Sequence, residues 1–156
     1  MNLRRTLLPL PLLCLALPAL AADGPHDGAI AARQGMFRQF GFNLGLLSDM
    51  AKEKRPYEAT LATHSAENLD LLTALHQDAF WPEGSDSEGA ENAENRALPA
   101  LWENMEDARE KFAGLAAAVD ELVPVAGEGV GELRGAVADV GGACKACHDE
   151  YRAERD

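Results

Sequence analysis

Apolar side chains recur every three or four positions through most of this chain, which is the spacing of the buried face of a helix. The first run of this kind consists of Ile30, Arg33, Phe37, Phe40, Leu44 and Leu47. A second helix is expected to begin at Pro56, because proline is favoured at the first helical position. Its apolar residues would be Leu61, Leu72, Leu75 and Phe80.

Two further runs follow a polar segment at residues 83–92, whose Gly, Ser, Asp and Glu residues predict a long loop. The third helix carries Leu98, Leu101, Met105, Ala108, Phe112, Leu115, Val119 and Leu122, and Pro124 and Gly127 end it. The fourth begins near Gly129 and carries Val130, Leu133, Val137, Val140, Cys144, Cys147 and Tyr151. The pattern predicts an all-α fold, an antiparallel up-down-up-down four-helix bundle with one long connection.

The N-terminus has the organisation of a secretion signal. Arg4 and Arg5 precede an apolar run at residues 7–20, and Ala19-Leu20-Ala21 has the A-x-A pattern of a cleavage site, with a small residue at each end. The run is short and rich in proline, so it is a poor membrane span. We expect residues 1–21 to be a cleaved signal peptide and residues 22–156 to form one four-helix-bundle domain in the periplasm.

The last helix contains the sequence Cys144-Lys-Ala-Cys147-His148. C-x-x-C-H is the attachment signature of haem c, in which two thiols form thioethers and the imidazole binds iron. On a helix all three side chains lie on one face, so they can meet one flat macrocycle. A thioredoxin-type pair would follow a strand and a zinc site would need further ligands, and neither pattern is present. We expect one haem c, with His148 as its metal ligand.

The chain has 14 basic and 26 acidic residues, for a net charge of −12. This charge argues against a nucleic acid or an anionic membrane as partner. It fits a solvated surface that promotes solubility, and it also fits docking of a basic redox partner. No group of acid, base and nucleophile converges on the motif, so we do not expect an enzyme.

With the C-x-x-C-H motif close to the C-terminus, the chain resembles the cytochrome c′ family in residues 32–37, 96–102 and 140–152. The resemblance implies that Arg33 lies near a haem propionate and that Arg152 lies beside the proximal face. It also implies that Gln34 and the turn at Asn95 and Arg96 line the haem edge. A homodimer through the first two helices is a further implication, and Phe42 and Leu46 on the outer side of the first helix are compatible with it.

The same resemblance places Phe37 over the distal face of the haem. High-spin members have a residue there that cannot bind iron, whereas low-spin relatives use a methionine of the first helix. Phe37 shares the spacing of Phe40 and Leu44, and Met36 is about 100° away around the helix. We therefore expect five-coordinate iron with an open apolar site that binds NO or CO, electron transfer, or both. The alternative is a six-coordinate electron carrier with Met36 as sixth ligand.

Overall fold

The computed structural model describes residues 24–154, so the expected signal peptide at residues 1–21 lies outside the described residues. The described chain is helical apart from its loops and one isolated bridge between Ala97 and Arg152. Its elements are α1 (Asp27–Ala51), α2 (Ala59–Thr73), the short 3₁₀ helix η1 (Asp78–Phe80), α3 (Ala100–Glu103), α4 (Met105–Leu122) and α5 (Val130–Tyr151).

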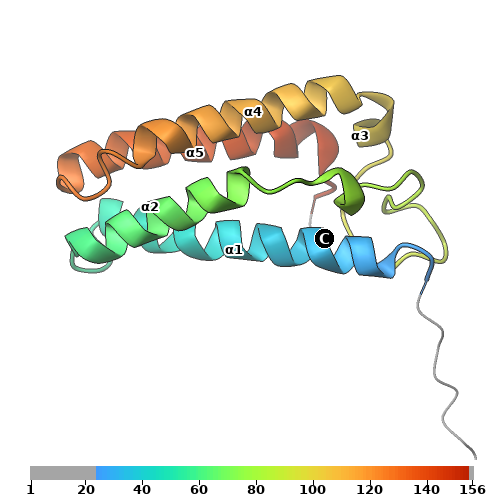
Figure 1. The fold of residues 1–156 in the computed structure, drawn as a ribbon, viewed down its shortest axis with the longest axis horizontal. Coiled ribbons are helices and arrows are strands. Elements are labelled where there is room, and N and C mark those ends of the chain that lie inside the picture. The colour runs from blue at the N-terminus through green and yellow to red at the C-terminus, as the bar shows by residue number, and fades with distance from the viewer. Residues whose placement is uncertain (1–23, 155–156) are drawn as a thin grey trace, which may run out of the picture.

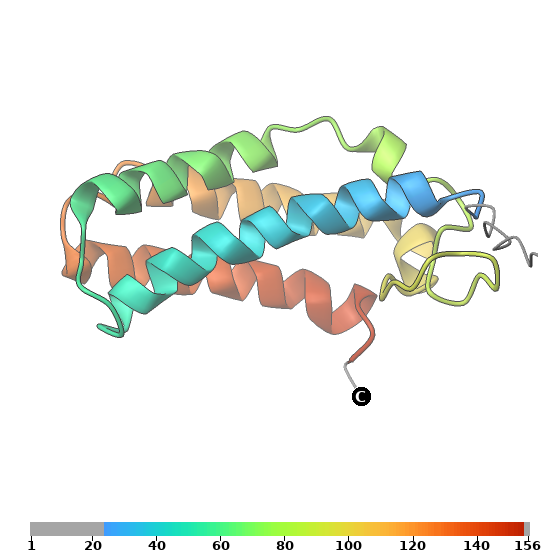
Figure 2. The ribbon, with the colours of Figure 1, turned by 90° about the horizontal axis from the view of Figure 1, so that it is seen from below.

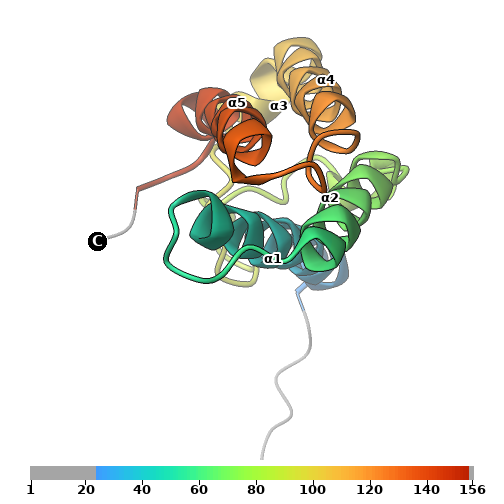
Figure 3. The same cartoon turned by 90° about the vertical axis from the view of Figure 1, so that its left-hand side faces the viewer.

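The four long helices form an antiparallel bundle. In Figure 1, α1 and α2 make one hairpin and α4 and α5 make the other. Seen from the end in Figure 3, the helices occupy the corners of a square, in which α1 touches α2 and α5, and α4 touches α5 and α2. The view of Figure 2 shows the long connection between α2 and α3 at one end of the bundle, beside the start of α1. The predicted all-α, up-down-up-down fold is confirmed.

The expected apolar faces of the last two long helices are also confirmed. The main core contains Leu115, Val119 and Leu122 of α4 together with Leu133, Val137 and Val140 of α5. Each of these side chains is at most 6% exposed. Burial of this apolar surface is the main favourable term that holds the two hairpins together.

The buried face of α1 differs from the expected one. Its buried residues are Ile30, Arg33, Met36, Phe40, Asn43, Leu47, Met50 and Ala51. Met36 is 5% exposed, whereas Phe37 is 37% exposed. The expected burial of Phe37 at this turn was therefore wrong, whereas its expected position over the haem stays a prediction. Because α1 packs against both α2 and α5, it buries a stripe wider than one line of residues, and Met36 lies inside that stripe.

The expected second and third helices are each interrupted. Helix α2 ends at Thr73, so Leu75 lies beyond it and Phe80 belongs to η1. The carbonyl of Phe80 accepts a hydrogen bond from Arg33 at 3.2 Å, and in a long helix that oxygen would instead accept from the backbone. The third helix breaks at Asn104, which has φ −127° and ψ 40° and separates α3 from α4. The spacing of apolar residues along the sequence does not reveal such breaks in a helix.

The loop at residues 83–97 is tied to the start of α1. Asp27 accepts a hydrogen bond from the backbone N–H of Ala93 at 2.7 Å, and Gln34 donates to the carbonyl of Glu94 at 2.8 Å. A Cβ atom on Gly24 would lie 2.0 Å from the carbonyl oxygen of Glu91, so only glycine allows the chain to pass this close. The predicted loop is therefore real, and it forms one end of the bundle.

Candidate haem site

The C-x-x-C-H motif lies in the last turns of α5, at the end of the bundle that the long loop covers. Cys144 is partly buried and packs against the main core. Cys147 is partly buried against a second, smaller cluster, which is built on Leu101, Ala108 and Tyr151 and includes Trp81, Ala100, Trp102 and Met105. Both cysteines are free thiols. They therefore stand at the border between two apolar clusters, with sulfur available for covalent attachment.

The protonation of the motif suits haem attachment. Burial raises the pKa of the Cys144 thiol and that of the Cys147 thiol, so both stay protonated at neutral pH. Burial, and secondly the charge of Arg152, lowers the pKa of His148 below its ordinary value of 6.5. A neutral imidazole keeps a lone pair for a metal ion. Nη1 of Arg152 lies 3.4 Å from Nε2 of His148.

Arg33 is buried, and its side chain makes several hydrogen bonds to the long connection between α2 and α3. The residue is 3% exposed. Nη1 donates to the carbonyl of Phe80 at 3.2 Å and to the hydroxyl of Ser85 at 2.7 Å. Nη2 donates to the carbonyl of Ser85 and, at 3.1 Å, to Oδ1 of Asn95. Four hydrogen bonds thus join this side chain to the connection between α2 and α3, one at η1 and three in the loop, while its predicted contact with a haem propionate stays a prediction.

The aromatic surroundings of Arg33 continue to Phe37. The Cζ atom of Arg33 lies 4.9 Å from the centre of the Trp81 ring and 5.7 Å from that of Trp102, which are cation–π distances. Burial lowers the pKa of the Arg33 guanidinium. The Trp81 ring also meets Phe37 edge-on at 6.2 Å. Sequence reasoning missed Trp81, because it lies outside every apolar run and only its place in the fold reveals it.

The end of α5 is joined to the loop by two backbone hydrogen bonds. Leu98 N–H donates to the carbonyl of Tyr151 at 3.0 Å, and Ala153 N–H donates to that of Arg96 at 2.9 Å. The guanidinium of Arg96 donates to the carbonyl of Ala153 at 3.3 Å. Arg96 and Arg152 therefore lie on adjoining segments beside His148, as a shared site requires. Their roles toward haem, like that of Gln34, stay predictions.

A charged network holds the same end of α5 against α4. The Tyr151 hydroxyl donates to Oδ2 of Asp107 at 2.5 Å, and Nζ of Lys111 lies 3.5 Å from Asp107 and 3.2 Å from Glu150. The hydrogen bond to Asp107 raises the pKa of Tyr151 to about 12 and lowers that of the Asp107 carboxyl. Tyr151 is one turn after Cys147, so this network fixes the helix that carries the motif.

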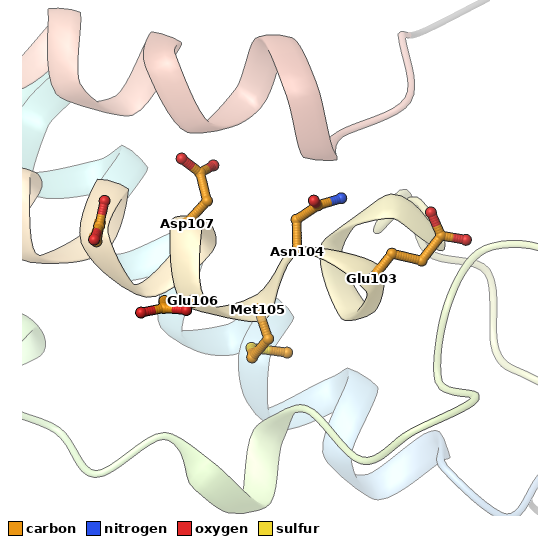
Figure 4. A pocket seen from close by; sticks show the side chains of 6 residues that line it. Glu103, Asn104, Met105, Glu106 and Asp107 are labelled. Atoms are coloured by element: carbon orange, nitrogen blue, oxygen red, sulfur yellow. The ribbon is translucent and has the colours of Figure 1, made fainter.

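An acidic pocket of about 380 Å³ lies beside this network, where α3 meets α4. It is lined by Glu103, Asn104, Met105, Glu106, Asp107 and Glu110. In Figure 4 the side chains of Asn104 and Asp107 point toward α5, whereas Met105 points the other way. Four carboxylates make this pocket unsuitable for an apolar macrocycle. The apolar clusters around the two cysteines suit haem far better.

The residues present fit haem c. Two free thiols and a neutral imidazole lie on one helix, aromatic side chains surround them, and the large ring of Phe37 is partly exposed beside Trp81. Among residues 24–154 there is no group of three or more His, Cys, Asp or Glu side chains that could hold a metal ion directly. A single histidine beside two cysteines suits iron that a porphyrin already holds.

Comparison with known proteins agrees with this fit. The family model for cytochrome c′ matches residues 28–152. Cytochrome c-554 of Cereibacter sphaeroides is 38% identical over 92% of this chain and 97% of its own length. Cytochrome c′ of the same organism is 35% identical over 98% of this chain and 100% of its own. The solved cytochrome c′ from Rhodobacter sphaeroides superposes with a TM-score of 0.80 at 33% identity, covering 83% of this chain and 98% of that one.

The four-helix bundle and its C-x-x-C-H site define a haem c-type cytochrome. The match over residues 28–152 and the full-length similarity to its relatives show the family, and this chain belongs to the cytochrome c′ family. Among the described residues, no helix is both long enough and apolar enough to cross a bilayer.

Proposed function

We propose that this chain is an exported cytochrome with one haem c, which Cys144 and Cys147 hold through two thioethers and His148 ligates from the proximal side. The observation that carries the proposal is the pair of free, half-buried thiols at the border of two apolar clusters, one turn of helix apart and next to a neutral imidazole. Bound haem supplies a one-electron couple and a site for diatomic ligands.

We further propose that Phe37 covers the distal face and that His148 is the sole protein ligand to iron. The Phe37 ring meets Phe40 at 6.1 Å and Trp81 at 6.2 Å, so its neighbours are aromatic. A phenyl ring can neither bind iron nor donate a hydrogen bond, so such a site favours NO and CO over O₂, which needs polar stabilisation. A variant of cytochrome c′ from Alcaligenes xylosoxidans, 28% identical to this chain with a TM-score of 0.70, has been solved as a nitric oxide complex.

A six-coordinate electron carrier is the second candidate, and the burial of Met36 favours it. Met36 is 5% exposed in the main core, and Cys144 packs against the same core. The first candidate binds NO or CO, transfers electrons, or does both, and the second transfers electrons; neither requires enzymatic turnover. They differ in the spin state of the ferric protein, which electron paramagnetic resonance measures directly. A high-spin signal supports Phe37 as the distal residue, and a low-spin signal that Met36→Leu abolishes supports Met36.

A homodimer through the α1–α2 hairpin is our proposal for self-association. Apart from Phe37, the exposed large apolar side chains here are Phe42 (63%) on α1, Leu71 (66%) on α2 and Leu75 (45%) just beyond α2. Exposed apolar groups on neighbouring helices are typical of an interface. Leu46, which was expected on the same outer surface, is half-buried. A cytochrome c′ that is 26% identical to this chain is described as having ligand-controlled dimer dissociation.

Export to the periplasm rests on the sequence signal at residues 1–21. An oxidising compartment also suits a mature chain whose remaining cysteines both belong to the haem motif. Intact mass spectrometry of the native protein tests the whole proposal at once. The expected species begins near Ala22 and carries the mass of one haem. A species that retains residues 1–21, or that loses haem on denaturation, contradicts the corresponding part.

A further inference from the structure

We infer that Asn95 is a positioning residue, which links Arg33 on α1 to the backbone that follows His148 on α5. The inference rests on the haem attachment proposed above. The family resemblance placed Asn95 at the haem edge, and the role inferred here is to hold neighbouring segments of the chain in position. Oδ1 of Asn95 accepts two hydrogen bonds, one from Nη2 of Arg33 and one from the backbone N–H of Ala97, both at 3.1 Å.

The amino group of the Asn95 side chain is also fully hydrogen-bonded. Its Nδ2 donates to the carbonyl of Asp86 at 3.0 Å and to that of Ala93 at 3.1 Å. A side-chain amide has two donors and two acceptor positions, and Asn95 uses all four. A surface turn does not need a side chain saturated in this way. The amide therefore fixes the loop, a buried arginine and the next residues of the chain in one arrangement.

From Asn95 the link runs to α5 through Ala97. Ala97 forms the isolated bridge with Arg152, which is made by the hydrogen bonds from Leu98 N–H to Tyr151 and from Ala153 N–H to Arg96. Arg152 N–H in turn donates to the carbonyl of His148 at 3.2 Å. Each step is a backbone contact, so a displacement of Ala97 is passed to the last turn of α5.

Losing the oxygen of Asn95 would disturb both ends of this link. Arg33 is 3% exposed, so one of its N–H groups would be left buried without an acceptor. The N–H of Ala97 would lose its acceptor as well.

Asn92 offers a matched comparison in the same loop. Its Nδ2 donates to the carbonyls of Gly84 at 2.8 Å and Asp86 at 2.9 Å, and no described hydrogen bond joins it to Arg33 or Ala97.

The experiment compares Asn95→Ala, Asn95→Asp and Asn92→Ala as purified haem proteins. One readout is amide hydrogen exchange at Leu98 and Ala153, and the other is the set of hyperfine-shifted proton NMR signals of the His148 ring in the ferric protein. Asn95→Ala should speed exchange at both amides by about tenfold, the effect of losing roughly one hydrogen bond, and should shift the His148 signals. Asn95→Asp keeps the oxygen that accepts from Arg33 and Ala97 but loses the two Nδ2 donors to the carbonyls of Asp86 and Ala93, so it should shift the His148 signals less than Asn95→Ala does. Asn92→Ala should leave both readouts unchanged.

Three results would overturn the inference. The first is faster exchange in Asn95→Ala with unaltered His148 signals, since Asn95 would then hold only the loop. The second is an equal shift in Asn92→Ala. If Asn95→Ala does not fold, Asn95→Gln takes its place, because the longer side chain displaces the same oxygen by one methylene. Unaltered His148 signals in Asn95→Gln are then the third result. Lack of covalent haem in the unaltered protein would overturn the proposed attachment and this inference together, whereas these three results leave the attachment standing.

Discussion

Met36 and Phe37 are neighbours in α1, yet their side chains lie in different surroundings. Met36 is 5% exposed in the main core, whereas Phe37 is 37% exposed and meets the ring of Trp81 at 6.2 Å. Only the thioether of Met36 can bind iron. The choice between a gas-binding cytochrome and a six-coordinate electron carrier therefore depends on which of these two adjacent residues faces the haem.

Removing the ring of Phe37 should speed ligand binding. Displacement of a packed ring costs about 1–3 kcal/mol, so Phe37→Ala should accelerate CO association with the ferrous protein by roughly tenfold or more. The spin state should stay unchanged, because no iron bond is lost. Met36→Leu should alter neither quantity. Stopped-flow mixing and electron paramagnetic resonance measure the two, and a low-spin protein that becomes high-spin in Met36→Leu would show that Met36 is a ligand.

The two cysteines should determine whether haem is covalently bound. In the double variant Cys144→Ala, Cys147→Ala, acidified acetone should extract all the haem, because no thioether remains. The unaltered protein should keep its colour under the same treatment, and a variant with one cysteine should keep it through one thioether. Haem that leaves the unaltered protein would refute covalent attachment.

Arg33 should be important for stability as well as for the site. Arg33→Leu removes four hydrogen bonds and leaves acceptors of the loop without donors, including those of the fully buried Ser85. We expect a loss of about 2–4 kcal/mol in the free energy of unfolding, measured by urea titration. Arg33→Lys should recover little of it, because an ammonium group lacks the planar fork. Arg38→Leu, at an exposed position of the same helix, should cost under about 0.5 kcal/mol.

The Tyr151–Asp107 hydrogen bond should make stability depend on pH at both extremes. The folded state raises the pKa of Tyr151 from 10.0 to about 12, so its contribution is full below about pH 10 and disappears as the pH rises through 12. The pKa of Asp107 is lowered from 3.8, so its contribution is present above that pH and disappears as the pH falls below it. Tyr151→Phe should therefore be less stable than the unaltered protein at neutral pH, and the difference should shrink at both extremes.

Carbon-13 NMR of labelled tyrosine measures the phenol directly in a Tyr57→Phe background, where Tyr151 is the tyrosine that remains. The ring signal should titrate well above pH 10. An ordinary titration near pH 10 would show that the hydrogen bond to Asp107 does not stabilise the protonated form.

The exposed apolar residues of the α1–α2 hairpin should mediate self-association. Phe42→Glu and Leu71→Glu each place a charge among apolar groups at the proposed interface, so the variants should be monomers in sedimentation experiments. Met105→Leu, on the other hairpin, should leave association unchanged. Monomeric unaltered protein at micromolar concentration would contradict the proposed dimer.

The sequence by itself determined the haem motif, the class of fold and the apolar faces of α4 and α5. These features are local, because Cys144, Cys147 and His148 need only one helix to share a face, and Leu133, Val137 and Val140 repeat at the helical period. The polar loop was equally predictable, since a segment without apolar residues cannot contribute to a core.

The tertiary structure decided the surroundings of the motif. Whether Met36 or Phe37 is buried depends on how α1 is covered by α2 and α5, which the period of α1 alone does not specify. Trp81 and Ser85 gain their roles from Arg33, which lies about fifty residues earlier in the chain and binds the loop through hydrogen bonds. Such contacts are directional and join distant segments, so no local pattern of apolar and polar residues encodes them, and they exist only once the bundle has closed.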